Sequence, residues 1–251
     1  MIILLVYQNF VFLITNHIRL MAKEYYKISY KTYFNERVKP VLLHGEETYP
    51  LYVQVTYDRE TIFFKSYYFD LFSRAKYDHL RVTLPQMVKL ESRVIDNIIA
   101  RNVDGFNLGL FERQYKMLSR DLLDSFDGTF KAWLAGYLRE EKMPGLGAIV
   151  SHGVEEVSSM QLWDDLRVCL DNGMFKVMEE QAARFGGPYL PLAAYVRHEL
   201  PKGPFCLPLH EWLPQEKRIE IEDFIDSIFW RVDMGEIIRV VRLTLHPKGI
   251  W

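Results

Sequence analysis

Alternation of apolar and polar residues predicts three β-strands early in the chain. Residues 25–34 alternate with period two, and residues 49–57 repeat that pattern after a polar connection over residues 36–47. Asp58-Arg59-Glu60 has the composition of a tight turn, and residues 61–69 are rich in β-branched and aromatic side chains. We therefore expect the second and third strands to form an antiparallel hairpin with one aromatic face that another element must cover.

A helix with a clear start signal follows these strands. Thr83 and Gln86 have the spacing of a capping box, and Pro85 falls in the first turn, where its missing N–H is not needed. The next apolar residues recur at helical spacing and form one stripe. We expect the sheet residues Tyr49, Val53 and Val55 to face the helix residues Val88, Ile95 and Ile98. Residues 23–102 are thus predicted to form a β-β-β-α module.

The rest of the chain, residues 103–251, is predicted to be mainly helical. Helical spacing runs over residues 110–141, as one helix or as two shorter ones, because Gly128 and Gly136 weaken it. Residues 143–147 are interpreted as a turn, and residues 158–185 as a second helical tract. The prolines of residues 188–214 argue against a long regular element there. Residues 216–232 predict a last helix and residues 237–245 a strand. The fold class expected for the chain is therefore α+β.

The start of the chain, residues 1–22, is an apolar extension with three interpretations. Residues 2–14 are too few to span a bilayer, which takes about 20 apolar residues, and they lack the flanks of a signal peptide. A translation start at Met21 is the favoured interpretation, ahead of a packed element and an export signal. We expect no membrane association. The two cysteines form no disulfide framework, so a cytoplasmic location is expected, with Cys169 as a small buried hydrophobic residue.

Charge separates the two parts of the sequence only weakly. Residues 21–101 hold 13 Lys and Arg against 10 Asp and Glu, a net of +3, and residues 102–251 hold 17 against 23, a net of −6. The whole chain carries −2, which argues against a uniformly basic nucleic-acid-binding protein. A local anionic partner for the first part remains compatible with these numbers.

Common catalytic and metal-binding motifs are missing from the sequence. Its seven histidines form no H-E-x-x-H or Cys/His metal spacing. It has no phosphate-binding loop, no dinucleotide-binding glycine motif and no G-x-S-x-G elbow. We therefore predict no catalytic residue, no metal ligand and no cofactor. An enzyme whose site residues are dispersed in the sequence and converge only in the folded chain is kept as an alternative.

Two segments keep a binding function open. Cations stand beside the aromatic residues of the hairpin or just after it, which suits contact with a phosphate backbone. They are Arg59, Lys65, Arg74, Lys76 and Arg81. Residues 188–214 combine prolines with aromatic residues and could instead contact a protein partner, or pack as an irregular loop.

Residues 49–57, with the sequence YPLYVQVTY, the polar turn at Arg59 and residues 61–67 resemble the arm-type DNA-binding domain at the N-terminus of tyrosine recombinases from mobile elements. The similarity covers roughly residues 25–100. It implies that the three-stranded sheet contacts duplex DNA, with Gln54, Arg59 and Lys65 at the matching polar positions. The family's catalytic H-x-x-R element is missing, and no tyrosine follows Tyr195, so the resemblance does not extend to recombinase chemistry.

These observations lead to three hypotheses. The first is a non-enzymatic DNA-binding or accessory protein associated with mobile elements, which binds through its N-terminal sheet. The second is a structural or protein-interaction module that uses residues 188–214. The third is an enzyme with a dispersed site. Basic residues on one exposed sheet face would favour the first, an exposed apolar patch the second, and a pocket of buried carboxylates or histidines the third.

Overall fold

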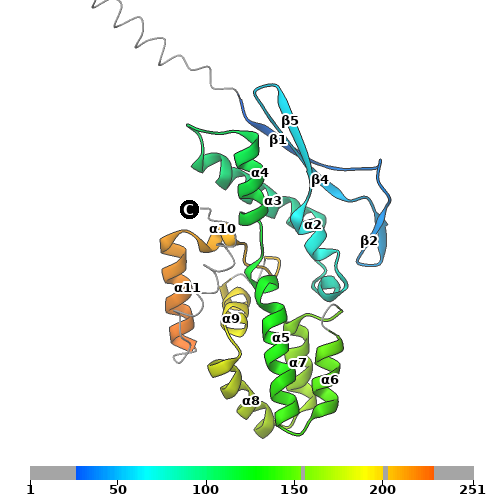
Figure 1. The fold of residues 1–251 in the computed structure, drawn as a ribbon, viewed down its shortest axis with the longest axis vertical. Coiled ribbons are helices and arrows are strands. Elements are labelled where there is room, and N and C mark those ends of the chain that lie inside the picture. The colour runs from blue at the N-terminus through cyan, green and yellow to red at the C-terminus, as the bar shows by residue number, and fades with distance from the viewer. Residues whose placement is uncertain (1–26, 154–155, 200–202, 229–251) are drawn as a thin grey trace, which may run out of the picture.

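The computed structural model describes residues 27–153, 156–199 and 203–228, and it confirms the α+β class. The strands are β1 (Ser29–Phe34), β2 (Val41–Leu43), β3 (Glu46–Thr48), β4 (Leu51–Tyr57) and β5 (Glu60–Lys65). A three-stranded antiparallel sheet has the order β1-β4-β5, and β2 and β3 form a separate hairpin. Helices lie beside one face of the sheet and dominate the described chain after β5 (Figure 1).

The helical elements follow the sheet in sequence. They are α2 (Tyr67–Phe72), η1 (Ala75–Leu80), α3 (Leu84–Arg101), α4 (Leu108–Leu118), α5 (Leu122–Glu140), α6 (Pro144–His152), α7 (Ser159–Cys169), α8 (Asn172–Phe185), α9 (Tyr189–Glu199), α10 (Leu209–Trp212) and α11 (Gln215–Ile228). None of the described helices is both long and apolar enough to cross a membrane. The predictions for residues 1–22 and for a strand at residues 237–245 concern parts of the chain outside the described residues.

In each of the two hairpins, a two-residue turn joins the strands. Asp58 and Arg59 have φ values of 48° and 65°, as a type I′ turn requires, so the predicted tight turn is confirmed. His44 and Gly45, with φ values of 55° and 84°, join β2 to β3 in the same way. This second hairpin spans residues 41–48, so the prediction of residues 36–47 as a polar connection without strands is wrong.

The third strand is shorter than predicted because a serine starts a helix. β5 ends at Lys65, and the Ser66 hydroxyl accepts a hydrogen bond of 3.0 Å from the backbone N–H of Phe69. That N-cap satisfies a free donor in the first turn of α2 and turns the aromatic run into a helix. The predicted strand over residues 61–69 is therefore wrong beyond Lys65.

Capping aspartates also divide the predicted helical tracts. Asp121 accepts hydrogen bonds from the backbone of Leu123 and Asp124 and starts α5, so the break lies before α5 and not at its glycines. Asp171 starts α8 in the same way. Side chains that accept from the free N–H groups of a first turn are the usual start signal of a helix.

Prolines lie in the first turn of two helices that the sequence does not predict. Pro144 is the first residue of α6, so the predicted turn over residues 143–147 is wrong. Pro191 lies in the first turn of α9, where a missing N–H has no intrahelical acceptor, so the expectation of no long regular element in residues 188–214 is also wrong. Gly147 lets α6 approach α5 closely, since a Cβ there would lie 2.8 Å from the Ala135 carbonyl oxygen.

The buried apolar residues form two clusters. The first, here called the sheet cluster, joins the inner face of the sheet to α2, α3 and α4, and it extends past residue 102, the boundary expected for the N-terminal module. Val53, Val55, Ile95 and Ile98 all belong to it and are fully buried. Tyr49 does not, because it is 37% exposed, so its predicted contact with α3 is wrong.

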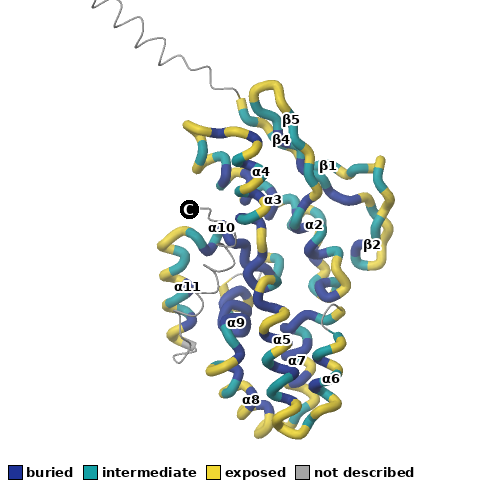
Figure 2. Tube along the Cα trace, viewed as in Figure 1, coloured by how far each residue is buried: buried dark blue, intermediate teal, exposed yellow. Residues whose placement is uncertain are grey.

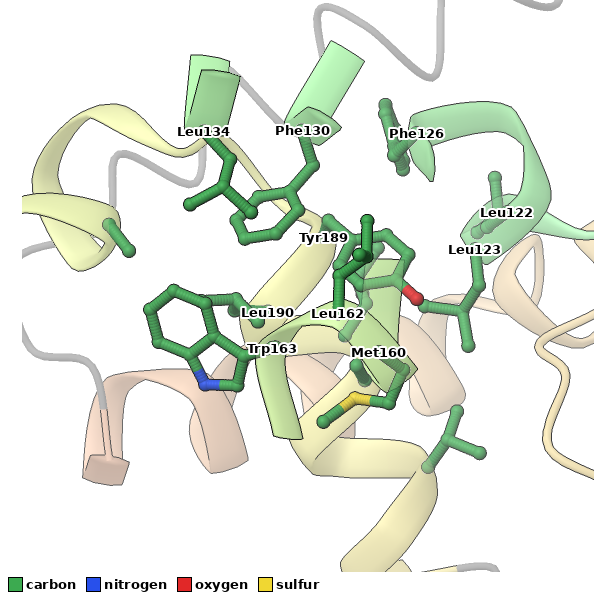
Figure 3. Packing of buried hydrophobic residues seen from close by; sticks show 14 of the residues in the cluster. Leu122, Leu123, Phe126, Phe130, Leu134, Met160, Leu162, Trp163, Tyr189 and Leu190 are labelled. Atoms are coloured by element: carbon green, nitrogen blue, oxygen red, sulfur yellow. The ribbon is translucent and has the colours of Figure 1, made fainter. Parts of the chain in front are cut away.

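The second cluster, here called the helical cluster, fills the space between α5 and the later helices. At its centre the Phe130 ring stacks on Tyr189 with a centroid separation of 5.2 Å and meets Trp163 edge-on at 5.8 Å (Figure 3). Met117 and Leu213 pack against both clusters. Cys169, which the sequence analysis expects in a core, is exposed at the end of α7.

Candidate nucleic-acid interface

The outer face of the three-stranded sheet is a regular grid of side chains. The strand register aligns its members in three rows, which are Tyr33, Tyr52 and Lys65, then Lys31, Gln54 and Phe63, then Ser29, Thr56 and Thr61. Buried and half-buried positions alternate over residues 51–56 of β4, and half-buried and exposed positions alternate over residues 62–65 of β5. Exposed residues mark the turn that joins the two strands (Figure 2). Because the helices cover the inner face, the described elements leave this grid open to solvent.

Aromatic rings and a hollow occupy the middle of this grid. The Tyr33 and Tyr52 rings lie 6.2 Å apart at 40° to each other, and the Phe63 side chain is 58% exposed. A hollow of about 610 Å³ lies among these three rings, Gln54 and the residues that end and follow β1. We call the five residues Lys31, Tyr33, Tyr52, Gln54 and Phe63 the aromatic sheet face.

Four positively charged side chains lie along the β1 edge of this face. Lys27, Lys31, Arg37 and Lys39 are all exposed, and within the described residues none of them forms an ion pair. Glu36 is the one carboxylate in residues 27–40, so this stretch carries a net charge of +3. The Lys31 Nζ lies 5.7 Å from the centre of the Tyr33 ring, which places a positive charge over an aromatic surface.

Three of the residues predicted to bind DNA lie on or beside this face. Gln54 lies in the middle row between Lys31 and Phe63. Arg59 is exposed at the tip of the β4–β5 hairpin. Lys65 ends β5 on the outer face, where its ammonium pairs with the half-exposed Asp70 carboxylate.

The structure places Arg74 and Lys76 elsewhere, at the junction of the two clusters. Both Arg74 and the Lys76 ammonium pair with Asp124 of α5, at 2.9 and 2.8 Å, and Lys76 also contacts Asp127 at 3.1 Å. Burial by itself lowers the pKa of Lys76, but the hydrogen bonds and charges of the two carboxylates outweigh it, so this pKa lies above its usual value. Lys76 is only 6% exposed, so its charge balances buried carboxylates and does not face solvent.

Arg81 is exposed but lies apart from the grid. Its guanidinium donates a 2.9 Å hydrogen bond to the carbonyl oxygen of His44 in the β2–β3 turn. The His44 ring itself contacts Asp78 and the Val82 carbonyl oxygen, both at 2.9 Å. Arg81 therefore attaches the small hairpin to η1.

Most of the described residues of 188–214 are buried, although residues 197–199, 203 and 214 are exposed. Tyr189, Tyr195 and Trp212 are each at most 2% exposed and belong to the helical cluster. Their rings are therefore packed inside the protein and are not available to a protein partner, contrary to the predicted contact surface.

Two buried carboxylates, Glu91 and Asp121, accept hydrogen bonds from donors of the protein itself. Glu91 accepts hydrogen bonds from the Ser66 hydroxyl, from the Tyr115 hydroxyl at 2.6 Å and from the Tyr68 N–H at 3.2 Å. Burial raises the pKa of Glu91. Asp121 accepts from the Leu207 N–H at 2.7 Å, and burial raises its pKa to about 7. These contacts join separate elements, which is what buried polar groups in a fold core require.

Metal binding finds no support in the described part of the chain. No group of three or more His, Cys, Asp or Glu side chains there could hold a metal ion.

Of the five residues of the aromatic sheet face, Gln54 alone is among the contacts predicted from the sequence. Lys31 and Tyr33 lie on β1 and Arg37 follows it, whereas the cationic contacts predicted from the sequence lie on the β4–β5 hairpin or after it. The alternation of residues 25–34 already places Lys31 and Tyr33 on one side of a strand. The pairing of β1 with β4, which aligns Lys31 with Gln54 and Tyr33 with Tyr52, has no signal in the sequence.

Comparisons with protein-family models, with curated proteins and with solved structures found no match to this chain.

Proposed function

We propose that this protein binds DNA through the outer face of its three-stranded sheet, as a non-enzymatic accessory protein. The observation that carries the proposal is an uncovered face on which the exposed Phe63 ring and the half-buried Tyr33 and Tyr52 rings stand beside cations that form no ion pair within the described residues. Lys31 and Arg37 supply charge for phosphates, and Gln54 supplies an amide that can both donate to and accept from a base. The association with mobile elements rests only on the resemblance of residues 49–67 to the recombinase arm domain.

Of the six predicted contact residues, Gln54, Arg59 and Lys65 remain in this proposal. Arg59 stands at the hairpin tip and Lys65 at the opposite end of β5, so the two could contact phosphates on either side of the aromatic sheet face. An exposed ion pair such as Lys65–Asp70 is weak, commonly about 0–1 kcal/mol, so a phosphate can compete with Asp70. Arg74, Lys76 and Arg81 have structural partners and are left out.

Fluorescence anisotropy with labelled DNA of mixed sequence, at low and moderate salt, tests the proposal. The full-length K31A/R37A variant should bind more weakly than the wild type. It should also show a flatter plot of log K against log salt, by about 0.7–0.9 for each phosphate that the variant no longer neutralises. The matched control is K89A/K176A, which removes two exposed lysines from α3 and α8. An absence of binding at low salt, or an equal loss of affinity in the control, would contradict DNA binding by this face.

A further inference from the structure

The shape of the aromatic sheet face bears on whether it contacts duplex or single-stranded DNA. Elements that read duplex DNA protrude into a groove, as a helix or a two-stranded ribbon does. This face instead has a hollow of about 610 Å³ at its centre. That volume falls within the range of about 300–1,000 Å³ typical of small-molecule sites, so the hollow can receive a protruding group the size of a base.

The rings around the hollow offer flat surfaces and not only edges. Phe63 is more than half exposed, and the tilted Tyr33 and Tyr52 rings stand in the adjacent row. Bases inside a duplex already have both faces stacked on their neighbours, so such rings could meet only their edges. Unstacked bases can lie on aromatic rings, and each stacked base contributes about 1–3 kcal/mol.

The positive side chains near the hollow are placed to contact a single strand of DNA that runs alongside β1. Lys31 lies above Tyr33, Arg37 lines the hollow, and Lys27 and Lys39 extend the exposed cations in both directions along the chain. The Gln54 amide stands between Lys31 and Phe63 in register, at a place where a base edge could contact it. Proteins that recognise single strands combine aromatic rings that stack on bases with cations that contact phosphates, and both components are present here.

We infer that the aromatic sheet face binds single-stranded DNA in preference to duplex, with bases stacked on Phe63 and on the Tyr33–Tyr52 pair. This inference rests on the proposed function and specifies its ligand. Lys31 and Arg37 contact the phosphates of the same strand, and Gln54 contacts a base edge. Stacking on rings discriminates little between bases, so sequence preference is weak.

The test compares a labelled single strand of mixed sequence with the duplex formed by the same strand and its complement. Full-length protein should bind the single strand more tightly at every salt concentration. F63A should weaken single-strand binding by about 5- to 150-fold, which corresponds to roughly 1–3 kcal/mol for one stacked base, and should weaken duplex binding by a smaller factor. F63W should retain single-strand binding, because indole also stacks.

The matched control is F185A, which removes an exposed ring on α8 that is 66% exposed. Thermal melting of each variant verifies that the fold is retained. If the protein binds neither form at low salt, both the proposed function and this inference fail. If it binds duplex at least as tightly as the single strand, or if F63A binds the single strand like the wild type, the inference fails while DNA binding stands. A preference of the wild type for the single strand that is lost in F63A and retained in F63W supports both the proposed function and this inference.

Discussion

Replacing Lys76 with methionine tests the role of the charged junction between the two clusters. Lys76 Nζ lies 2.8 Å from Asp124 Oδ1 and 3.1 Å from Asp127 Oδ2, and only 8% of its side chain is exposed. Methionine keeps most of the aliphatic volume and removes the charge. The variant K76M therefore isolates the ionic contribution of this side chain to the free energy of unfolding.

The structure limits the size of the effect. A buried charge left with no compensation costs about 3–5 kcal/mol. After K76M, Asp127 still has the Lys131 ammonium at 2.8 Å, and Asp124 still has Arg74 at 2.9 Å. The substitution removes two charge-assisted hydrogen bonds, but it also removes the cost of burying the ammonium. We expect K76M to lower the free energy of unfolding by about 2 kcal/mol, or about 4–8 °C in melting temperature for a chain of this size.

Urea unfolding followed by circular dichroism measures this difference. The matched control is K89M on the exposed surface of α3, which should change the free energy by less than about 0.5 kcal/mol. In a double-mutant cycle, K76M and D127N together should cost less than the sum of the two single changes, because the two groups interact. A K76M protein that unfolds like the wild type would refute the idea that this ion cluster joins the two parts.

Three further predictions concern stability. V53D should cost several kcal/mol, since Val53 is fully buried, whereas V103D, at a side chain that is 54% exposed, should cost little; melting temperatures compare them. G147A should cost about 1–3 kcal/mol in urea unfolding because the new Cβ meets the Ala135 carbonyl oxygen, whereas G128A in α5 has open space and should stabilise the protein by about 0.5–1 kcal/mol; equal effects would contradict the close helix approach. Burial raises the pKa of Asp121 from 3.8 to about 7, so folding favours its neutral form. The stability of the wild type relative to D121N should therefore fall as pH rises from about 4 to 7, by at most ~4 kcal/mol, and a constant difference across that range would show that the pKa is not raised.

Local patterns in the sequence were sufficient for most of the sheet and for α3. The alternation in residues 49–57 marks β4 because one face of that strand is buried, and the Thr83–Gln86 pair starts α3 as predicted, with Gln86 Oε1 accepting a 2.8 Å hydrogen bond from the Thr83 N–H. The errors arose where a local signal has two outcomes. Proline can end a helix or occupy its first turn, and only the surrounding packing decides between them at Pro144 and Pro191.

The candidate site was harder to predict because charge alone does not report burial. Lys76 follows the hairpin by only a few residues and looks like any surface lysine in the sequence. Its burial depends on Asp124 and Asp127, which lie about fifty positions further along the chain. Lys31 and Tyr33 became part of the site through the pairing of β1 with β4, which is also a long-range property.

The two cysteines of this chain lie in opposite environments. Cys169 is exposed at the end of α7, whereas Cys206 is buried in the sheet cluster, although it comes from the segment after α9. Burial also raises the pKa of the Cys206 thiol, which disfavours the reactive thiolate. A maleimide dye should therefore modify one thiol per native molecule and two per unfolded molecule. Modification of the second thiol would then report the separation of the 203–208 segment from the sheet cluster, so the natural sequence carries its own chemical probe of that opening.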